Sequence, residues 1–165
     1  MFGYLADCTL ECYNKDMNKD DDFDKLVATR RKWYYSVNEV HCRYLNEKVV
    51  FNNHGFKHIL RDGRGHYRTK ADAKMRLNLL TWAPVVIKTA IFMPSSEFRD
   101  ADDKRNHLGK PVTFFEIQGT ISHPVGKSKK KRYLEITVIL RRIGDGNLHY
   151  YSIRYTKHGL NEISD

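Results

Sequence analysis

The fold is decided by the stretch from Tyr133 to Thr156, which reads YLEITVILRRI, then GDGN, then LHYYSIRYT. Apolar and polar residues alternate in the two longer runs, as in strands that bury one face. An Asp-Gly pair between such runs is a strong hairpin signal, because a type I′ turn needs positive φ at both central residues. We therefore predict a β-hairpin with Asp145 and Gly146 as its two turn residues.

This turn sets the register, and the register assigns the side chains to two faces. The expected pairs are Ile143 with Leu148, Arg141 with Tyr150, Leu140 with Tyr151, Ile139 with Ser152 and Thr137 with Arg154. The face expected in the core carries Leu134, Ile136, Val138, Leu140, Tyr151, Ile153 and Tyr155. The other face carries Glu135, Thr137, Arg141, Tyr150, Ser152 and Arg154. Its guanidinium and hydroxyl groups suit an anionic polymeric substrate.

Helices are expected ahead of this sheet. The prediction rests on apolar residues three and four positions apart, on helix caps at Asn52-Asn53 and Thr69, and on a helix break at Pro84. The expected helices cover residues 22–46, 54–61, 70–82 and 84–89. A loop is expected over residues 94–110, followed by a third strand over residues 112–121. Helices followed by antiparallel strands predict an α+β fold, with the helices on one face of a small antiparallel sheet.

The bulk composition favours a basic, globular domain. The 165 residues are 41% hydrophobic and carry a formal charge of +9, with a pI of about 9.5. Such a positive field attracts nucleic acid. No segment approaches the roughly 18 apolar residues of a membrane span, so no membrane contact is expected. The three cysteines, Cys8, Cys12 and Cys42, have no recurring spacing, which favours a reducing, cytoplasmic location.

Two histidines of the short helix, His54 and His58, lie one turn apart on the face that also carries Arg61. Metal-independent RNA cleavage needs a base for the 2′-hydroxyl proton, an acid for the leaving oxygen and cations around the phosphate. Histidine and arginine supply these groups near neutral pH. We expect an endoribonuclease without a cofactor or metal, with His58 as the main acid/base. The expected catalytic residues are His54, His58, Thr137, Arg141, Ser152 and Arg154, with Arg61, Tyr150 and Glu135 in substrate binding.

Short motifs spread along the chain support the same reading. They are Val50-Phe51, Gly55-Phe56-Lys57-His58-Ile59, Ala83-Pro84, KPVTFFE at 110–116, TVILRRIGDG at 137–146 and HYYS at 149–152. Their order resembles the phage and mobile-element branch of the barnase/EndoU/colicin/RelE-like nuclease superfamily. The resemblance implies an α+β ribonuclease domain over residues 48–158, with a helical extension at 1–47 and a tail at 159–165. It also implies a toxin or effector in which His58 takes the place of the family's helix histidine, near Arg141, Thr137 and Ser152.

A basic run, Lys127 to Arg132, lies between the expected strand over residues 112–121 and the hairpin. Such a run binds an RNA backbone through salt-sensitive phosphate contacts. The residues expected to make these contacts are Lys129, Lys130, Lys131 and Arg132. The expected partners are tRNA or mRNA. A ribonuclease needs restraint in its own cell, so an acidic antitoxin or immunity protein is also expected, drawn by complementary charge.

Two other functions fit parts of the sequence. Glu116-Ile117-Gln118 is similar to the acidic strand of Mg²⁺-dependent nucleases, and Asp100, Asp102 and Asp103 lie upstream of it. This reading ranks second because those aspartates are expected in a loop. A non-catalytic RNA- or DNA-binding module would use the same basic surface. Incubation with RNA in EDTA separates the three functions.

Overall fold

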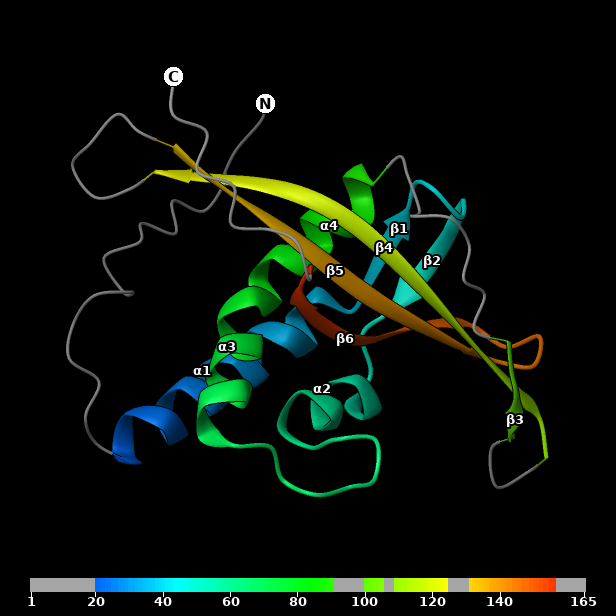
Figure 1. The fold of residues 1–165 in the computed structure, drawn as a ribbon, viewed down its shortest axis with the longest axis horizontal. Helices are drawn as coiled ribbons and strands as arrows, with labels where there is room; N and C mark the ends of the chain where they lie inside the picture. Colours follow the sequence, from blue (N-terminus) through cyan, green and yellow to red (C-terminus); the bar gives the residue numbers. More distant parts are fainter. Residues whose placement is uncertain (1–19, 91–99, 106–108, 125–130, 157–165) are drawn as a thin grey trace.

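The computed structural model describes residues 20–90, 100–105, 109–124 and 131–156. These residues form an α+β fold in which helices pack against a six-stranded sheet (Figure 1). The helices are α1 (Asp20–Val37), α2 (Asn53–Leu60), α3 (Lys70–Leu79) and α4 (Ala83–Thr89), with a 3-10 turn at Leu80–Trp82 between the last two. The strands are β1 (Glu39–Cys42), β2 (Glu47–Val50), β3 (Asp100–Arg105), β4 (Pro111–Pro124), β5 (Lys131–Ile143) and β6 (Leu148–Tyr155). The predicted fold class is confirmed.

The sheet runs in the order β1-β2-β6-β5-β4-β3, and it is mixed rather than antiparallel throughout as predicted. Neighbouring strands pair antiparallel, but β2 and β6 pair in parallel, with Val49 beside Leu148 and Val50 beside His149. The parallel pair covers only the first residues of β6. The rest of that edge is therefore open to the helices that follow β2, and α2 and α3 both contact β6.

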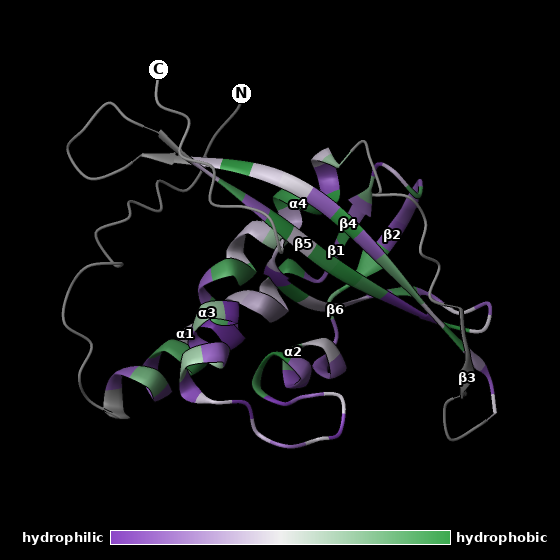
Figure 2. Ribbon diagram, in the orientation of Figure 1, coloured by the Kyte–Doolittle hydropathy of each residue, from purple (hydrophilic) through white to green (hydrophobic). Residues whose placement is uncertain are grey.

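The predicted core face of β5 is confirmed. Ile136, Val138 and Leu140 have no exposed surface, and Ile153 of β6 is equally buried. They pack in one cluster with apolar residues of the helices, among them Leu77 of α3 and Ile87 of α4. Hydrophobic and hydrophilic segments alternate along β4 and β5 in Figure 2, as the pleat requires.

The predicted register fails at the turn end of the hairpin. Ile139 lies opposite Ser152 as expected, but Leu140 lies opposite Tyr150 instead of Tyr151. Tyr151 is thus an extra residue in β6, a β-bulge, and residues on its turn side exchange faces. Tyr150, expected on the polar face, is fully buried in the core, whereas Tyr151 leaves the core face.

The turn itself explains the difference. Gly146 N donates to Ile143 O at 3.0 Å, and Gly144 is the turn residue with positive φ, at 52°. Positive φ at the first central position only is the pattern of a type II′ turn, which glycine accommodates. The central residues are therefore Gly144 and Asp145, one position earlier than the type I′ turn that we predicted. Next to the turn the observed pairs are shifted by one residue from the predicted ones, as Arg141 opposite His149 shows, and the bulge at Tyr151 restores the predicted pairing from Ile139 and Ser152 onward.

The first helix is shorter than predicted. It ends at Val37 because Asn38 adopts a left-handed conformation, with φ at 59°, which asparagine tolerates better than most residues. The segment to Asn46, expected to be helical, forms β1 and its turn, and β1 pairs with β2. Tyr34 of α1 lies in the same core cluster as the sheet residues. The predicted division after residue 47 therefore falls inside β2, which pairs with β1.

Three further predictions concern residues 100–105, the cysteines and the membrane. Residues 100–105, expected within a loop, form β3 beside β4. The Mg²⁺-dependent nuclease was ranked second because these aspartates were expected in a loop, and that expectation is wrong. Cys42 is buried with a free thiol, while Cys8 and Cys12 lie outside the described residues. No helix in the described part of the chain is long and apolar enough to cross a membrane.

Candidate functional site

The Asn52 side chain makes two hydrogen bonds, one that caps α2 and one to His149 of β6. Its Oδ1 accepts from Gly55 N at 3.1 Å, which caps the helix. This orientation leaves the amide Nδ2 to donate to His149 Nδ1 at 3.0 Å. Because an amide nitrogen only donates, His149 Nδ1 accepts and its ring is neutral in this state. The parallel pairing of β2 with β6 is what brings the two residues together.

Gly55 lets α2 lie directly against β6. A Cβ at this position would be 2.3 Å from the backbone oxygen of Tyr150 and 2.5 Å from the hydroxyl of Tyr34. Both distances are shorter than any normal contact, so a larger residue would push the helix away. The histidines of α2 therefore reach the sheet only because residue 55 has no side chain.

The two helix histidines lie against one aromatic residue of the bulge. The ring centroid of His58 is 3.8 Å from that of Tyr151, and the His54 ring is 5.9 Å from the same ring. Phe114 of β4 contacts the Tyr151 ring edge-on at 5.1 Å. The bulge thus places the Tyr151 ring between α2 and β4, where it positions both imidazoles.

Arg141 supplies the sheet side of this cluster. Its Nη1 lies 2.7 Å from His54 Nε2, and its guanidinium carbon lies 5.7 Å from the centre of the Tyr151 ring. Arginine has only donors, so His54 Nε2 is the acceptor and the His54 ring is neutral. One guanidinium is therefore held between an imidazole and an aromatic ring at the polar face of β5.

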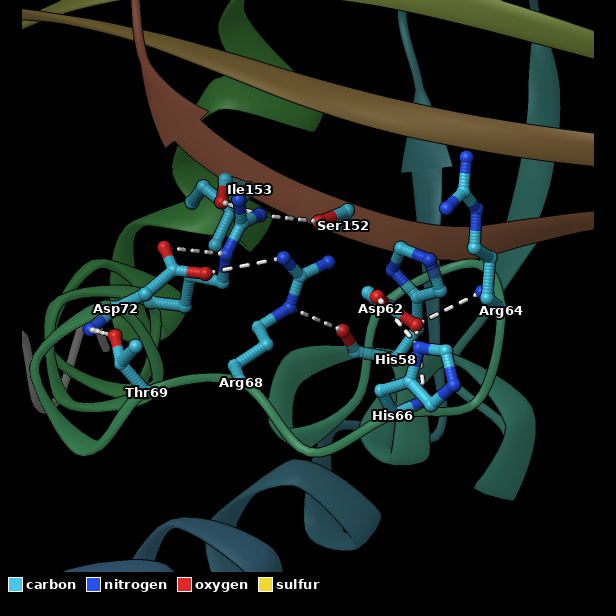
Figure 3. A network of polar contacts seen from close by, with 10 residues as sticks. His58, Asp62, Arg64, His66, Arg68, Thr69, Asp72, Ser152 and Ile153 are labelled. Atoms are coloured by element: carbon cyan, nitrogen blue, oxygen red, sulfur yellow. Dashed lines mark hydrogen bonds and ion pairs between the residues drawn. The ribbon is translucent and has the colours of Figure 1, made fainter.

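Arg68 lies beside His58 in Figure 3, and Arg76 of α3 shares its carboxylate partner, Asp72. Arg68 donates from Nε to the His58 backbone oxygen at 3.3 Å and from Nη1 to Asp72 at 3.0 Å. Arg76 also bonds Asp72, and its Nη1 donates to Ser152 Oγ at 2.8 Å. The two arginine side chains are each 14% exposed and share one carboxylate, so a net positive charge lies beside His58.

These surroundings disfavour the charged form of all three histidines. Burial, then the guanidiniums of Arg68 and Arg76, lower the pKa of His58 to about 4. Burial and then Arg141 lower the pKa values of His54 and His149. His58 Nδ1 is buried and has no hydrogen-bond partner within the described parts of the chain. We name the set His54, His58, Arg68, Arg76, Arg141, His149 and Tyr151 the histidine–arginine cluster. Among the described residues it combines neutral imidazoles with three guanidiniums, two of which share the Asp72 carboxylate, and this arrangement suits a phosphate group.

The structure brings together only some of the predicted site residues. Arg61 lies over the ring of Tyr67 at 3.9 Å, and Arg154 forms an ion pair with Glu116 at 3.0 Å. Thr137 is buried with its hydroxyl 3.0 Å from that of Thr156. The predictions that Arg61 and Arg154 bind phosphate therefore have no support from their present contacts, and buried Tyr150 is wrongly placed among substrate-binding residues.

The remaining predicted residues contribute little to this geometry. Glu135 accepts a hydrogen bond through its backbone oxygen, from Thr156 N at 2.9 Å. Ser152 is buried and acts through Arg76. Lys129 and Lys130 lie outside the described residues, as do the side chains of Lys131 and Arg132.

The sequence did not assign four members of the cluster to the site, namely Arg68, Arg76, His149 and Tyr151. Arg68, Asp72 and Arg76 show the spacing of four residues that predicts ion pairs on a helix, but this spacing gives no hint of contact with β6. Tyr151 was expected in the core because the alternation of apolar and polar residues does not reveal the bulge. His149 was identified by sequence only within a motif.

Comparison with known proteins adds no relative. No family model matches the chain, and neither the curated proteins nor the solved structures include a significant match.

Proposed function

We propose that the chain is a metal-independent endoribonuclease that cleaves RNA at the histidine–arginine cluster. One observation carries the proposal: two neutral imidazoles, His54 and His58, lie against the same tyrosine ring, with arginine side chains beside each of them. This arrangement supplies a base, a potential acid and phosphate-binding cations without a metal.

His58 suits the role of base. Its lowered pKa keeps it neutral at pH 7, so it can take the proton of a 2′-hydroxyl. The 2′-oxygen then attacks the adjacent phosphorus, and the bond from phosphorus to the 5′-oxygen breaks. In the proposed mechanism Arg68 and Arg141 stabilise the charge that builds on the phosphate oxygens.

His54 suits the role of acid once substrate binds. In the free protein its Nε2 accepts from Arg141. A phosphate that takes over the Arg141 donors frees this nitrogen, and its negative charge raises the pKa of His54. The resulting imidazolium can protonate the leaving 5′-oxygen. The products are a 2′,3′-cyclic phosphate and a 5′-hydroxyl, and the protons balance.

The experiment is incubation of the purified protein with an end-labelled oligoribonucleotide in EDTA. We expect fragments that end in a 2′,3′-cyclic phosphate, and no cut at a position where the substrate carries a 2′-deoxynucleotide. Cleavage only after Mg²⁺ is added would replace the proposal with a metal-dependent nuclease. Intact RNA that is shifted on a gel would replace it with a binding module.

A further inference from the structure

Residues 61–67, which we name the α2–α3 loop, form an ordered basic element next to the histidine–arginine cluster. Asp62 Oδ1 accepts from Arg64 N at 2.8 Å and from His66 N at 2.9 Å. The loop is closed by a β-bridge between Arg61 and Tyr67. Its conformation is therefore fixed before any ligand arrives, which reduces the entropic cost of binding.

This loop borders the cluster directly. A Cβ at Gly63 would lie 3.9 Å from the Tyr151 hydroxyl, so the loop backbone passes beside the ring that holds His58. Arg64 is exposed, and Figure 3 shows its side chain extending toward β6 on the same side as the His58 ring. The Arg64 guanidinium can therefore contact an anionic ligand that extends from the cluster along this side.

Tyr67 gives the loop an aromatic surface. It is 74% exposed, and it has the highest exposure among the large hydrophobic side chains of the described residues. The Arg61 guanidinium covers its ring at 3.9 Å, and the Arg61 Nη1 bonds Gly65 O at 2.9 Å, which limits the motion of both side chains. An exposed ring that is already held in place is suited to stacking on an unpaired base.

We propose that the α2–α3 loop is a subsite for single-stranded RNA, in which Arg64 contacts a backbone phosphate and Tyr67 stacks on a base outside the scissile dinucleotide. This proposal rests on the proposed function for its substrate class. Double-stranded RNA is a poor ligand for such a subsite, because its bases are already stacked and paired.

The test measures binding of a fluorescent 2′-O-methyl oligonucleotide in EDTA by anisotropy, because this ligand cannot be cleaved by 2′-hydroxyl attack. Tyr67→Ala should weaken binding roughly 5- to 100-fold, the usual worth of one stacked base, whereas Tyr67→Phe should retain it. Arg64→Ala should lower the slope of log affinity against log salt by about 0.7, the value for one phosphate contact. Competition with a duplex of the same sequence should be weak.

Matched controls are Arg43→Ala and Tyr44→Ala. These exposed residues form the same pair of residue types in the β1–β2 turn, which lies far from the α2–α3 loop in Figure 1. They should leave binding and its salt slope unchanged. The subsite is overturned if Tyr67→Ala and Arg64→Ala bind like the wild type, or if Tyr44→Ala weakens binding as much as Tyr67→Ala. If the protein cuts no RNA but its binding to the oligonucleotide still depends on Tyr67, the proposed activity is excluded and the proposed subsite is supported.

Discussion

A hydrogen bond of 2.7 Å joins Arg141 of β5 to His54 of α2, although 87 positions separate them in the chain. The bond fixes which nitrogen of His54 carries the proton and keeps the arginine at the polar face of the sheet. Burial lowers the pKa values of His54, His58 and His149, and this guanidinium lowers all three further. The positive charge of Arg141 on the sheet therefore disfavours the protonated form of all three histidines.

Replacement of His58 by alanine should reduce RNA cleavage by about 10² to 10⁴, the usual contribution of a general base or acid. RNA affinity should change little, because a neutral imidazole contributes no charge to binding. His41→Ala is the matched control, since His41 is an exposed histidine of β1 that belongs neither to the cluster nor to the α2–α3 loop. A His58→Ala protein that folds and cuts at the original rate would exclude His58 from the mechanism.

The lowered pKa of His58 predicts a loss of folding stability in mild acid. Between pH 6.5 and about 4 the unfolded chain binds a proton at this residue and the folded chain does not. The free energy of unfolding therefore falls as the pH falls through this window. Urea denaturation of the wild type and of His58→Gln at pH 7 and pH 4.5 measures the effect. The variant should lose less stability than the wild type, and equal losses would contradict the assignment.

Replacement of Arg141 by alanine should weaken RNA binding and cleavage together, because it removes a phosphate contact and the positioning of His54. The pKa values of His54 and His149 should rise when the nearby cation is gone. NMR titration of the imidazole signals follows both values. Arg142→Ala is the control on the neighbouring residue, whose guanidinium pairs with Glu47 instead. Unchanged histidine titrations in Arg141→Ala would show that this guanidinium does not set their charge.

Replacement of Gly55 by alanine should destabilise the fold by about 1 to 3 kcal/mol, the usual cost of an overpacked site. The added methyl group would meet the Tyr150 backbone and the Tyr34 hydroxyl, so α2 must shift away from β6. Cleavage should also fall, because His54 and His58 move with the helix. Urea denaturation and activity give the two measurements, with exposed Lys57→Ala on the same helix as control. Wild-type stability in Gly55→Ala would show that α2 lies farther from the sheet.

The sequence determined the parts of this protein that depend on local chemistry. Alternation identified Ile136, Val138, Leu140 and Ile153 as core residues, because a strand repeats every two residues wherever it is paired. The cap at Asn52 and the break at Pro84 located α2 and α4, because these residues act on the backbone within a few positions.

Tertiary structure alone decided which residues meet at the candidate site. An extra residue such as Tyr151 leaves the alternation on either side intact, so neither the bulge nor the exchange of faces is visible in sequence. Arg61 and Arg68 look equally suited to the site in sequence. The Gly65 carbonyl and the Tyr67 ring hold the guanidinium of Arg61, whereas the Asp72 ion pair and the His58 backbone oxygen hold that of Arg68 beside His58. Such choices depend on contacts between segments distant in the chain, and local propensity carries no information about them.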